Sequence, residues 1–176
     1  NNENVDLATP NAVSPSKLAH VVLRTPDVDA MRDWYLDVLN AQVTLDSKSD
    51  AFHMCFLRYD EEHHRIAFMR HPRRPDVMPG DGPLEHISFT YASLDDLLST
   101  YGRLAAKGIE PFLPIHHGPT MSLYYNDPDG NRVELQIDTM DLGDAIDYVE
   151  SSEFIENPIG VIFDPADIRR RLNAGE

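Results

Sequence analysis

The sequence contains a single cysteine, Cys55, among its 176 residues, which excludes an internal disulfide and any zinc site built from cysteines. The neighbours of Cys55 are typical of a strand, so we expect an inert, buried thiol. No apolar run approaches the roughly 18 residues of a membrane span. The first 16 residues also lack the basic and apolar segments of a secretory signal. These absences favour a protein of the reducing cytoplasm.

Positive charge is also scarce, because 15 lysine and arginine residues stand against 30 aspartate and glutamate residues, with a formal net charge of −15. Nucleic acids and anionic membranes both need a positive surface, so the charge argues against either as a partner. A small substrate stays compatible, since a local pocket can differ in sign from the whole surface. The apolar fraction of 41% suffices for one domain, or for two half-domains that share one core.

An internal repeat organises the chain. The run LAHVVL at 18–23 recurs as LEHISF at 84–89, which places His20 and His86 in the third position of two opening strands 66 residues apart. An amphipathic helix follows each opening strand, over Val28–Leu39 and Leu94–Lys107, and three strands follow each helix. These later strands are expected over Ala41–Leu45, Ala51–Tyr59 and His64–Arg70, then over Glu110–Ile115, Thr120–Asn126 and Arg132–Ile137.

The sequence therefore predicts an α+β fold of two tandem βαβββ modules that form a shared open-barrel sheet around a metal site. Asp27 and Ser93 stand where helix N-caps belong, and Asn40 and Gly108 where the helices should end. We expect a flexible leader over 1–16, modules over 17–71 and 84–139, and a linker rich in proline and glycine over 72–83.

The remaining residues, 140–176, do not continue the repeat and are expected to form a tail that packs on the domain and covers a sheet edge or the mouth of the pocket. Short helices are predicted over 144–150 and 165–172, with Asp164 as the cap of the second and Pro165 at its first position. An extended or turn segment over 157–161 should join them.

Glu134 lies on the strand that follows the tight turn DPDGN at 127–131. Strand alternation places Glu134 on the face that His20 and His86 share, opposite to its two apolar neighbours. A buried carboxylate without a partner would be costly there, and a cation removes that cost. Two imidazoles and one carboxylate are the ligands of non-haem Fe(II) oxygenases, which keep positions open for substrate and O₂. We predict one Fe²⁺ ion in this site; Mn²⁺ suits the same ligands.

The assignment of His20 and His86 as metal ligands depends on the repeat, since a lone histidine in a strand is more often a core or edge residue than a ligand. Two histidines at matching positions, with a glutamate on a third related strand, favour the metal site. The repeat also predicts where a fourth ligand would lie, because 134 − 66 = 68 is Phe68, which cannot ligate. Three protein ligands are therefore expected.

The paired modules, the histidine-bearing opening strands and the run LYYNDPDGNRVEL at 123–135 resemble the vicinal oxygen chelate superfamily over about residues 17–138. That superfamily includes glyoxalase I, resistance proteins for bleomycin and fosfomycin, methylmalonyl-CoA epimerase and type I extradiol dioxygenases. The turn at 127–131 is specific for the superfamily but for no single activity. Phe68 fits a dioxygenase with three protein ligands and counts against glyoxalase I, which has four.

Further matches within the superfamily point to the one-domain extradiol catechol dioxygenases. The run EEHHRIAF at 61–68 resembles their strand whose second histidine is the catalytic acid and base, here His64. Tyr124, ten residues before Glu134, corresponds to the tyrosine that hydrogen-bonds the catecholate; a core tyrosine is the alternative. His116 and His117 lie near a family histidine that helps to hold the substrate, and the following Gly-Pro favours His117.

The resemblance implies an Fe(II)-dependent extradiol dioxygenase that inserts O₂ into a catechol-type, biphenyl-2,3-diol-like substrate. One alternative is a non-oxidative metal-dependent lyase, epimerase or thiol transferase, and another is a small-molecule binding or resistance protein. Better-known extradiol enzymes have four modules, whereas this chain must build its site from two, so the tail or a second subunit would supply the missing wall. Exposed sheet edges also fit a homodimer.

Three further histidines receive no role in this interpretation. His63 should point to solvent from the strand that carries His64. His53 and His71 belong to no constellation in the sequence and are expected at the surface.

Overall fold

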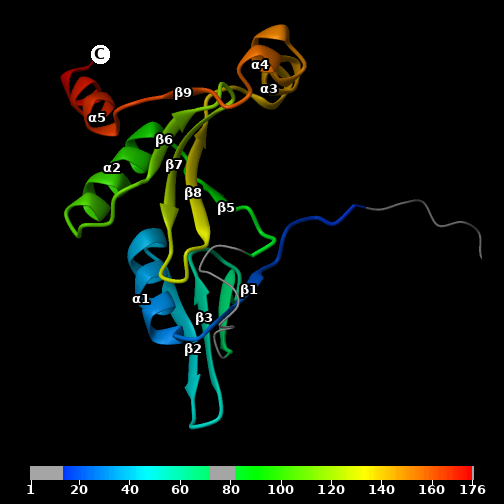
Figure 1. Cartoon of the computed structure of the whole chain (residues 1–176), viewed down its shortest axis with the longest axis vertical. Helices are drawn as coiled ribbons and strands as arrows, with labels where there is room; N and C mark the ends of the chain where they lie inside the picture. Colours follow the sequence, from blue (N-terminus) through cyan, green and yellow to red (C-terminus); the bar gives the residue numbers. More distant parts are fainter. Residues whose placement is uncertain (1–13, 72–81, 176) are drawn as a thin grey trace, which may run out of the picture.

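The computed structural model describes residues 14–71 and 82–175 and has an α+β architecture (Figure 1). Residues 1–13 of the expected leader and 72–81 of the expected linker lie outside this range. The first module consists of β1 (Val21–Thr25), α1 (Val28–Leu39), β2 (Gln42–Lys48), β3 (His53–Arg58) and β4 (Ile66–Arg70). The second consists of β5 (Ile87–Thr90), α2 (Leu94–Ala105), β6 (Leu113–His116), β7 (Thr120–Asn126) and β8 (Arg132–Asp138).

The two modules have the same topology, which confirms the predicted repeat. The first sheet has the strand order β1-β4-β3-β2 and the second β5-β8-β7-β6-β9. In both sheets the opening strand pairs in parallel with the last strand of its module, β1 with β4 and β5 with β8, and the other neighbours are antiparallel. His20 and His86 each stand one residue before their strand, β1 and β5, instead of third within it.

Both long helices begin at the residues that the sequence predicts. The side chain of Asp27 accepts a hydrogen bond from the backbone N–H of Ala30, and the side chain of Ser93 accepts one from Asp96. Because these side chains satisfy backbone donors that have no partner within the helix, they fix its first turn. Asn40, at φ 51°, ends α1 in the left-handed conformation. None of the described helices is long and apolar enough to cross a membrane.

A single hydrophobic core joins the modules, as expected of two half-domains. It lies between the two helices and one face of each sheet, and the same side of the molecule carries α1 and α2 in Figure 1. Members of the core come from both modules, including Met31, Tyr35 and Phe68 from the first and Leu123 and Leu135 from the second. Cys55 is fully buried in this core, as predicted, and burial raises the pKa of its thiol to about 11.

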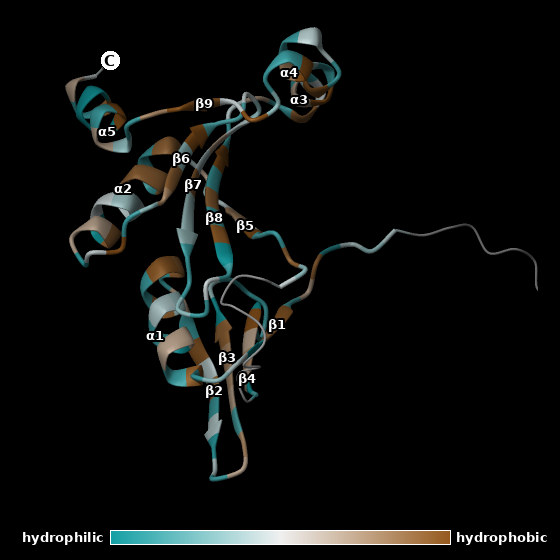
Figure 2. Ribbon diagram, in the orientation of Figure 1, coloured by the Kyte–Doolittle hydropathy of each residue, from teal (hydrophilic) through white to brown (hydrophobic). Residues whose placement is uncertain are grey.

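The face of each sheet that is turned away from its helix is here called its open face. In the described chain the two sheets remain separate and are not closed into one barrel, so the expected shared sheet is not formed within a single chain. The open face of the first sheet exposes apolar side chains, including Val22 at 48%, Met69 at 39% and Leu45 at 37% exposure. Figure 2 shows hydrophobic residues along β1 and β3. This apolar surface has no cover from the described residues.

The turn between β7 and β8 ties the two modules together through one buried carboxylate. Asp127 Oδ1 accepts hydrogen bonds from the backbone N–H groups of Asp129 at 3.0 Å and Asn131 at 2.9 Å. Asp127 Oδ2 accepts from the Asn131 side chain at 2.9 Å and from the hydroxyl of Tyr35, on α1, at 3.1 Å. Burial raises the pKa of Asp127, and the hydrogen bonds from Asn131 and Tyr35 oppose this shift.

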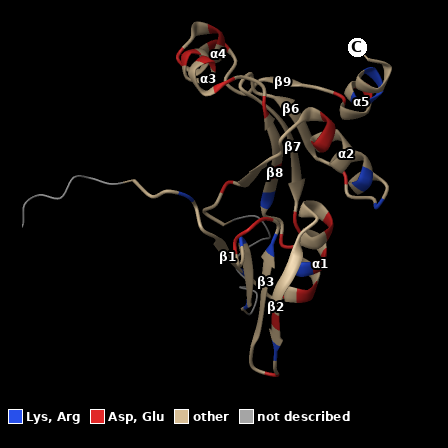
Figure 3. Ribbon diagram, turned by 180° about the vertical axis from the view of Figure 1, so that it is seen from behind, with Lys and Arg blue, Asp and Glu red and all other residues tan. Residues whose placement is uncertain are grey.

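The tail consists of α3 (Leu142–Val149), α4 (Ser152–Glu156), β9 (Val161–Ile162) and α5 (Pro165–Ala174). Asp164 caps α5 and Pro165 begins it, as predicted, whereas α4, which Ser151 caps, was not predicted. The tail returns to the second module, because β9 pairs with the β6 edge and Arg169 on α5 forms an ion pair of 2.7 Å with Asp95 on α2. Figure 3 shows basic residues on α5 and acidic ones on α2.

Replacement of Tyr35 by Phe should lower the free energy of unfolding by about 1–3 kcal/mol, because it leaves a buried carboxylate with one donor fewer. Urea denaturation measures this loss. Tyr125→Phe is the matched control, since the Tyr125 hydroxyl is also buried but has no hydrogen-bond partner among the described residues. Equal losses in the two variants would contradict a specific role for the bond between Tyr35 and Asp127.

Candidate metal and substrate site

The open face of the second sheet carries four of the predicted site residues, which are His86, His117, Tyr124 and Glu134. Strand alternation sends Leu135 into the core and Glu134 to the open face, where Tyr124 is its register partner on β7. His86 precedes β5, and its Nε2 lies 3.2 Å from Glu134 Oε2. The ring of His86 meets Tyr124 edge-on, with 5.5 Å between ring centroids. This half of the site therefore forms within one module.

Glu134 is a carboxylate at 4% exposure on a sheet face that lacks a lysine or arginine partner for it among the described residues. Burial, followed by the neighbouring Glu134 carboxylate, raises the pKa of the Tyr124 hydroxyl. A buried carboxylate beside an imidazole nitrogen is a fitting pair of donors for a divalent cation. His86 and the buried Glu134 are therefore suitable as two of the three ligands of the predicted metal site.

His20 and His64 lie together on the first sheet. Their ring centroids are 4.3 Å apart, and the ring of His64 stacks on Phe56 at the same centroid distance. Phe56 reaches the open face because its neighbours Cys55 and Leu57 point into the core. Burial lowers the pKa of His64, and the neighbouring His20 and His63 add to this shift. The Nδ1 atom of His64 is buried without a hydrogen-bond partner in the described part of the chain.

The described chain does not bring these two halves together. A cavity of about 230 Å³ lies where β1 and β5 begin, and its lining includes His20, Arg65 and Ser88 but neither His86 nor Glu134. Among the described residues, His20 forms no ligand group with His86 and Glu134. Phe68, at the position of a fourth ligand, is fully buried in the core. To complete the metal site, His20 would have to approach His86 and Glu134 through a movement of the modules, or come from another chain.

The two histidines at the end of β6, His116 and His117, point to different partners. His117 Nε2 lies 3.2 Å from the Tyr124 hydroxyl, and His117 Nδ1 lies 2.7 Å from the carbonyl oxygen of Ile159 in the tail. His116 instead accepts a hydrogen bond from the backbone N–H of Gly118 through its Nδ1, at 3.1 Å. His117 is thus the member of the pair that contacts Tyr124. The contact with Ile159 was not predicted, because no local pattern links residues 42 positions apart.

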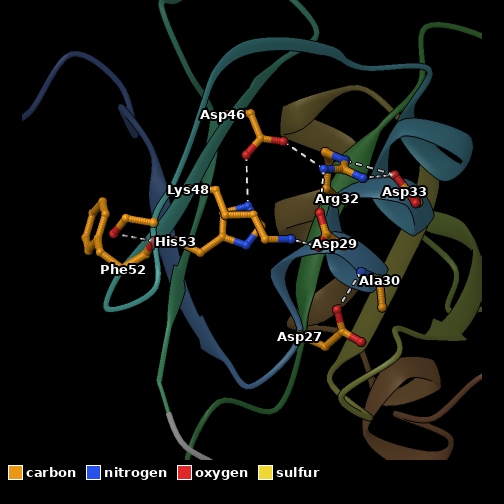
Figure 4. A network of polar contacts seen from close by, with 10 residues as sticks. Asp27, Asp29, Ala30, Arg32, Asp33, Asp46, Lys48, Phe52 and His53 are labelled. Atoms are coloured by element: carbon orange, nitrogen blue, oxygen red, sulfur yellow. Dashed lines mark hydrogen bonds and ion pairs between the residues drawn. The ribbon is translucent and has the colours of Figure 1, made fainter.

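The prediction for His53 was wrong, since its side chain is buried, at 3% exposure of the residue. Its Nε2 forms a bond of 2.8 Å with Asp46 Oδ1 across the β2–β3 hairpin (Figure 4). Alternation gives the reason, because His53 shares a face with the core residues Cys55 and Leu57. His63 is exposed, as expected, and His71 is exposed as well.

Asp29, Asp46 and His53 are the group of described residues whose ligand atoms come close enough to hold a metal. Basic side chains already pair with both carboxylates, however. Arg32 forms ion pairs of 2.7 Å with Asp29 and Asp46, and Lys48 forms one of 2.5 Å with Asp29. Burial would raise the pKa of Asp46, but the hydrogen bonds from His53 and Arg32 outweigh it and leave that pKa lowered. We interpret the cluster as an ion-pair network that ties α1 to the hairpin.

Comparison with known proteins agrees with this architecture. The family model "Glyoxalase/Bleomycin resistance protein/Dioxygenase superfamily" matches residues 17–135. Biphenyl-2,3-diol 1,2-dioxygenase 2 of Rhodococcus globerulus is 48% identical over 161 residues, which cover 90% of this chain and 83% of the relative. Biphenyl-2,3-diol 1,2-dioxygenase 3 of the same organism is 44% identical over 162 residues, with the same coverage.

A solved structure extends the likeness to three dimensions. The glyoxylase/bleomycin resistance protein/dioxygenase domain from Frankia sp. EAN1pec superposes with a TM-score of 0.59 at 25% identity, covering 71% of this chain and 99% of that one. The repeated βαβββ topology, the paired histidine positions and these matches lead to one conclusion. The chain belongs to the glyoxalase/bleomycin resistance protein/dioxygenase superfamily.

Proposed function

We propose that this protein is an extradiol dioxygenase that inserts O₂ into a catechol-type substrate related to biphenyl-2,3-diol. The observation that carries the proposal is the identity of 48% and 44% to two biphenyl-2,3-diol 1,2-dioxygenases over 90% of the chain. The pair of half-buried His86 and buried Glu134 supports a metal-dependent reaction, because it offers an imidazole ligand and a carboxylate ligand to a divalent cation.

The proposed metal is Fe²⁺, held by His20, His86 and Glu134, with Mn²⁺ as the alternative for the same donors. When bound, the metal acts as a Lewis acid that favours ionisation of a substrate hydroxyl. Tyr124 then donates a hydrogen bond to the ionised oxygen, and His117 orients the second hydroxyl. His64 transfers a proton to the substrate during cleavage of the ring, which suits an imidazole without a fixed hydrogen-bond partner at Nδ1.

The proposed active form is a homodimer in which a second copy of the chain supplies the missing half of the site. Two features support this assembly: the chain keeps His20 and His64 on one sheet and His86 and Glu134 on the other, and the first sheet exposes Val22, Met69 and Leu45 on its open face. A two-fold axis would bring the first sheet of each copy onto the second sheet of the other. This arrangement completes two equal sites and buries the apolar open face of the first sheet in both copies.

Oxygen uptake tests the activity. Protein purified anaerobically and loaded with iron should consume O₂ with 2,3-dihydroxybiphenyl and form a yellow ring-opened product. Glu134→Ala should lose the bound iron and the uptake together, because it removes the anionic ligand. Asp46→Ala is the matched control, since it deletes a carboxylate from the ion-pair network and should keep the iron content of the unaltered protein.

Two results would overturn this assignment. Iron-loaded protein that consumes no O₂ with any catechol would favour a non-oxidative enzyme of the superfamily. Full iron content in Glu134→Ala would refute the metal site even if the activity is present.

Replacement of His64 by Asn should reduce oxygen uptake by about 100-fold or more while iron content stays unchanged, because general acid–base catalysis typically contributes a factor of this size. His63→Asn serves as the control, since the neighbouring imidazole is exposed and should be dispensable. Turnover that is equal in the His64 and His63 variants would exclude a proton-transfer role for His64.

Complementation tests the shared site. His20→Ala and His86→Ala should each lose iron as homodimers, whereas a purified heterodimer of the two should bind about half the iron of the unaltered dimer, because one of its two sites regains all ligands. If both halves of a site came from one chain, the heterodimer would hold no complete site and bind none. Sedimentation of the iron-loaded protein as a monomer would also refute the assembly.

A further inference from the structure

The loop that carries His117 is packed between two segments of the tail. Gly118 adopts φ +101°, and a Cβ atom there would lie 2.3 Å from the ring of Tyr148 on α3. Gly160 adopts φ +99°, and a Cβ atom there would lie 2.1 Å from the carbonyl oxygen of His116. These contacts require glycine at both positions, since any side chain would collide with a ring or a backbone. The tail therefore lies directly against the backbone around His117.

A small turn in the tail, residues 157–160, makes the closest approach. The side chain of Asn157 closes it, because its Nδ2 donates to the carbonyl of Gly160 at 3.0 Å and its Oδ1 accepts from the N–H of Gly160 at 3.2 Å. Immediately after the turn, β9 pairs with β6, with Val161 opposite His116. The turn and the strand pairing together fix the position of the Ile159 carbonyl, which points to the imidazole of His117.

This carbonyl determines which nitrogen of His117 carries the hydrogen. A carbonyl oxygen only accepts hydrogen bonds, so the contact of 2.7 Å with Ile159 requires a hydrogen on Nδ1. In the neutral ring, Nε2 then has a free lone pair and accepts from the Tyr124 hydroxyl, 3.2 Å away. The tail thus makes His117 a hydrogen-bond acceptor on the open face of the second sheet.

We propose that the turn at 157–160 is a positioning element of the active site, which holds His117 as the Nδ1–H tautomer so that Nε2 accepts a hydrogen bond from a substrate hydroxyl. The inference rests on the proposed function for the identity of that substrate. A catechol that has lost one proton keeps one O–H group, and this donor matches an acceptor nitrogen. The opposite tautomer would carry its hydrogen on Nε2 and would offer no acceptor to this O–H group.

The tautomer is directly measurable by NMR. In metal-free protein labelled with ¹⁵N-histidine, long-range ¹H–¹⁵N spectra distinguish a protonated from an unprotonated ring nitrogen, and loss of a signal in His117→Asn assigns it. We expect protonated Nδ1 in the unaltered protein. Asn157→Ala removes the side chain that closes the turn, and Gly160→Ala pushes the turn away from the His116 backbone. Both variants should shift His117 toward the Nε2–H form.

The kinetic counterpart uses the iron-loaded protein. In both variants KM for 2,3-dihydroxybiphenyl should rise about 10-fold at unchanged iron content, the effect of one lost hydrogen bond to the substrate. Gly175→Ala is the matched control for Gly160→Ala, because it has a similar φ of +80° in the same tail but open space around its Cβ position. Asn173→Ala, on exposed α5, is the control for Asn157→Ala.

The proposal is overturned if His117 keeps its Nδ1 hydrogen and KM is unchanged in both turn variants, or if the two controls change as much as the variants do. Because the NMR measurement needs no turnover, it decides the positioning role even if no catechol is consumed. Failure of oxygen uptake alone would count against the proposed activity and not against the tautomer.

Discussion

The burial of one carboxylate, that of Asp127, fixes the geometry on which the candidate site depends. This side chain accepts four hydrogen bonds, three from its own turn and one from Tyr35 on the helix of the other module. The turn determines the register of β7 against β8, and the register places Tyr124 opposite Glu134. Because strand alternation has a period of two, a shift of one residue at this turn would send Glu134 into the core.

The pattern of the sequence predicted the elements that depend on local chemistry. The helix starts at Asp27 and Ser93 agree with the structure, because a cap acts within three residues of its own position. The 66-residue repeat predicted two equal modules because equal patterns fold into equal units. The approach of Glu134 to His86 also follows from the repeat and from alternation, since β5 and β8 are neighbours in one sheet.

Long-range relations could not be predicted in the same way. Whether the two sheets close on each other depends on how the modules pack, and no residue pattern within a module encodes that angle. His53 is a polar residue and was expected at the surface, yet the register of β3 turns its side chain inward, where it contacts Asp46. The contact of Ile159 with His117 involves a backbone carbonyl, which every residue possesses, so the sequence carries no signal for it.

The two sheets divide the properties of the site between them. The open face of the first offers apolar surface and two imidazoles, of which His64 stacks on Phe56. The open face of the second is polar and holds the buried acid, Glu134, with Tyr124 and His117 beside it. An aromatic diol has the same two characters, an apolar ring and a polar edge. A site assembled from one face of each kind would bind such a molecule in a single orientation.

The position of the Asn157–Gly160 turn has a consequence for protein engineering. The superfamily model spans residues 17–135, and the carbonyl that orients His117 belongs to residue 159. A chimera that exchanges only the two modules between relatives would transfer the side chains of the site, including His117. It would not transfer the Ile159 carbonyl that orients His117. Exchange boundaries for this protein therefore belong after α5, at the end of the tail, instead of at the end of β8.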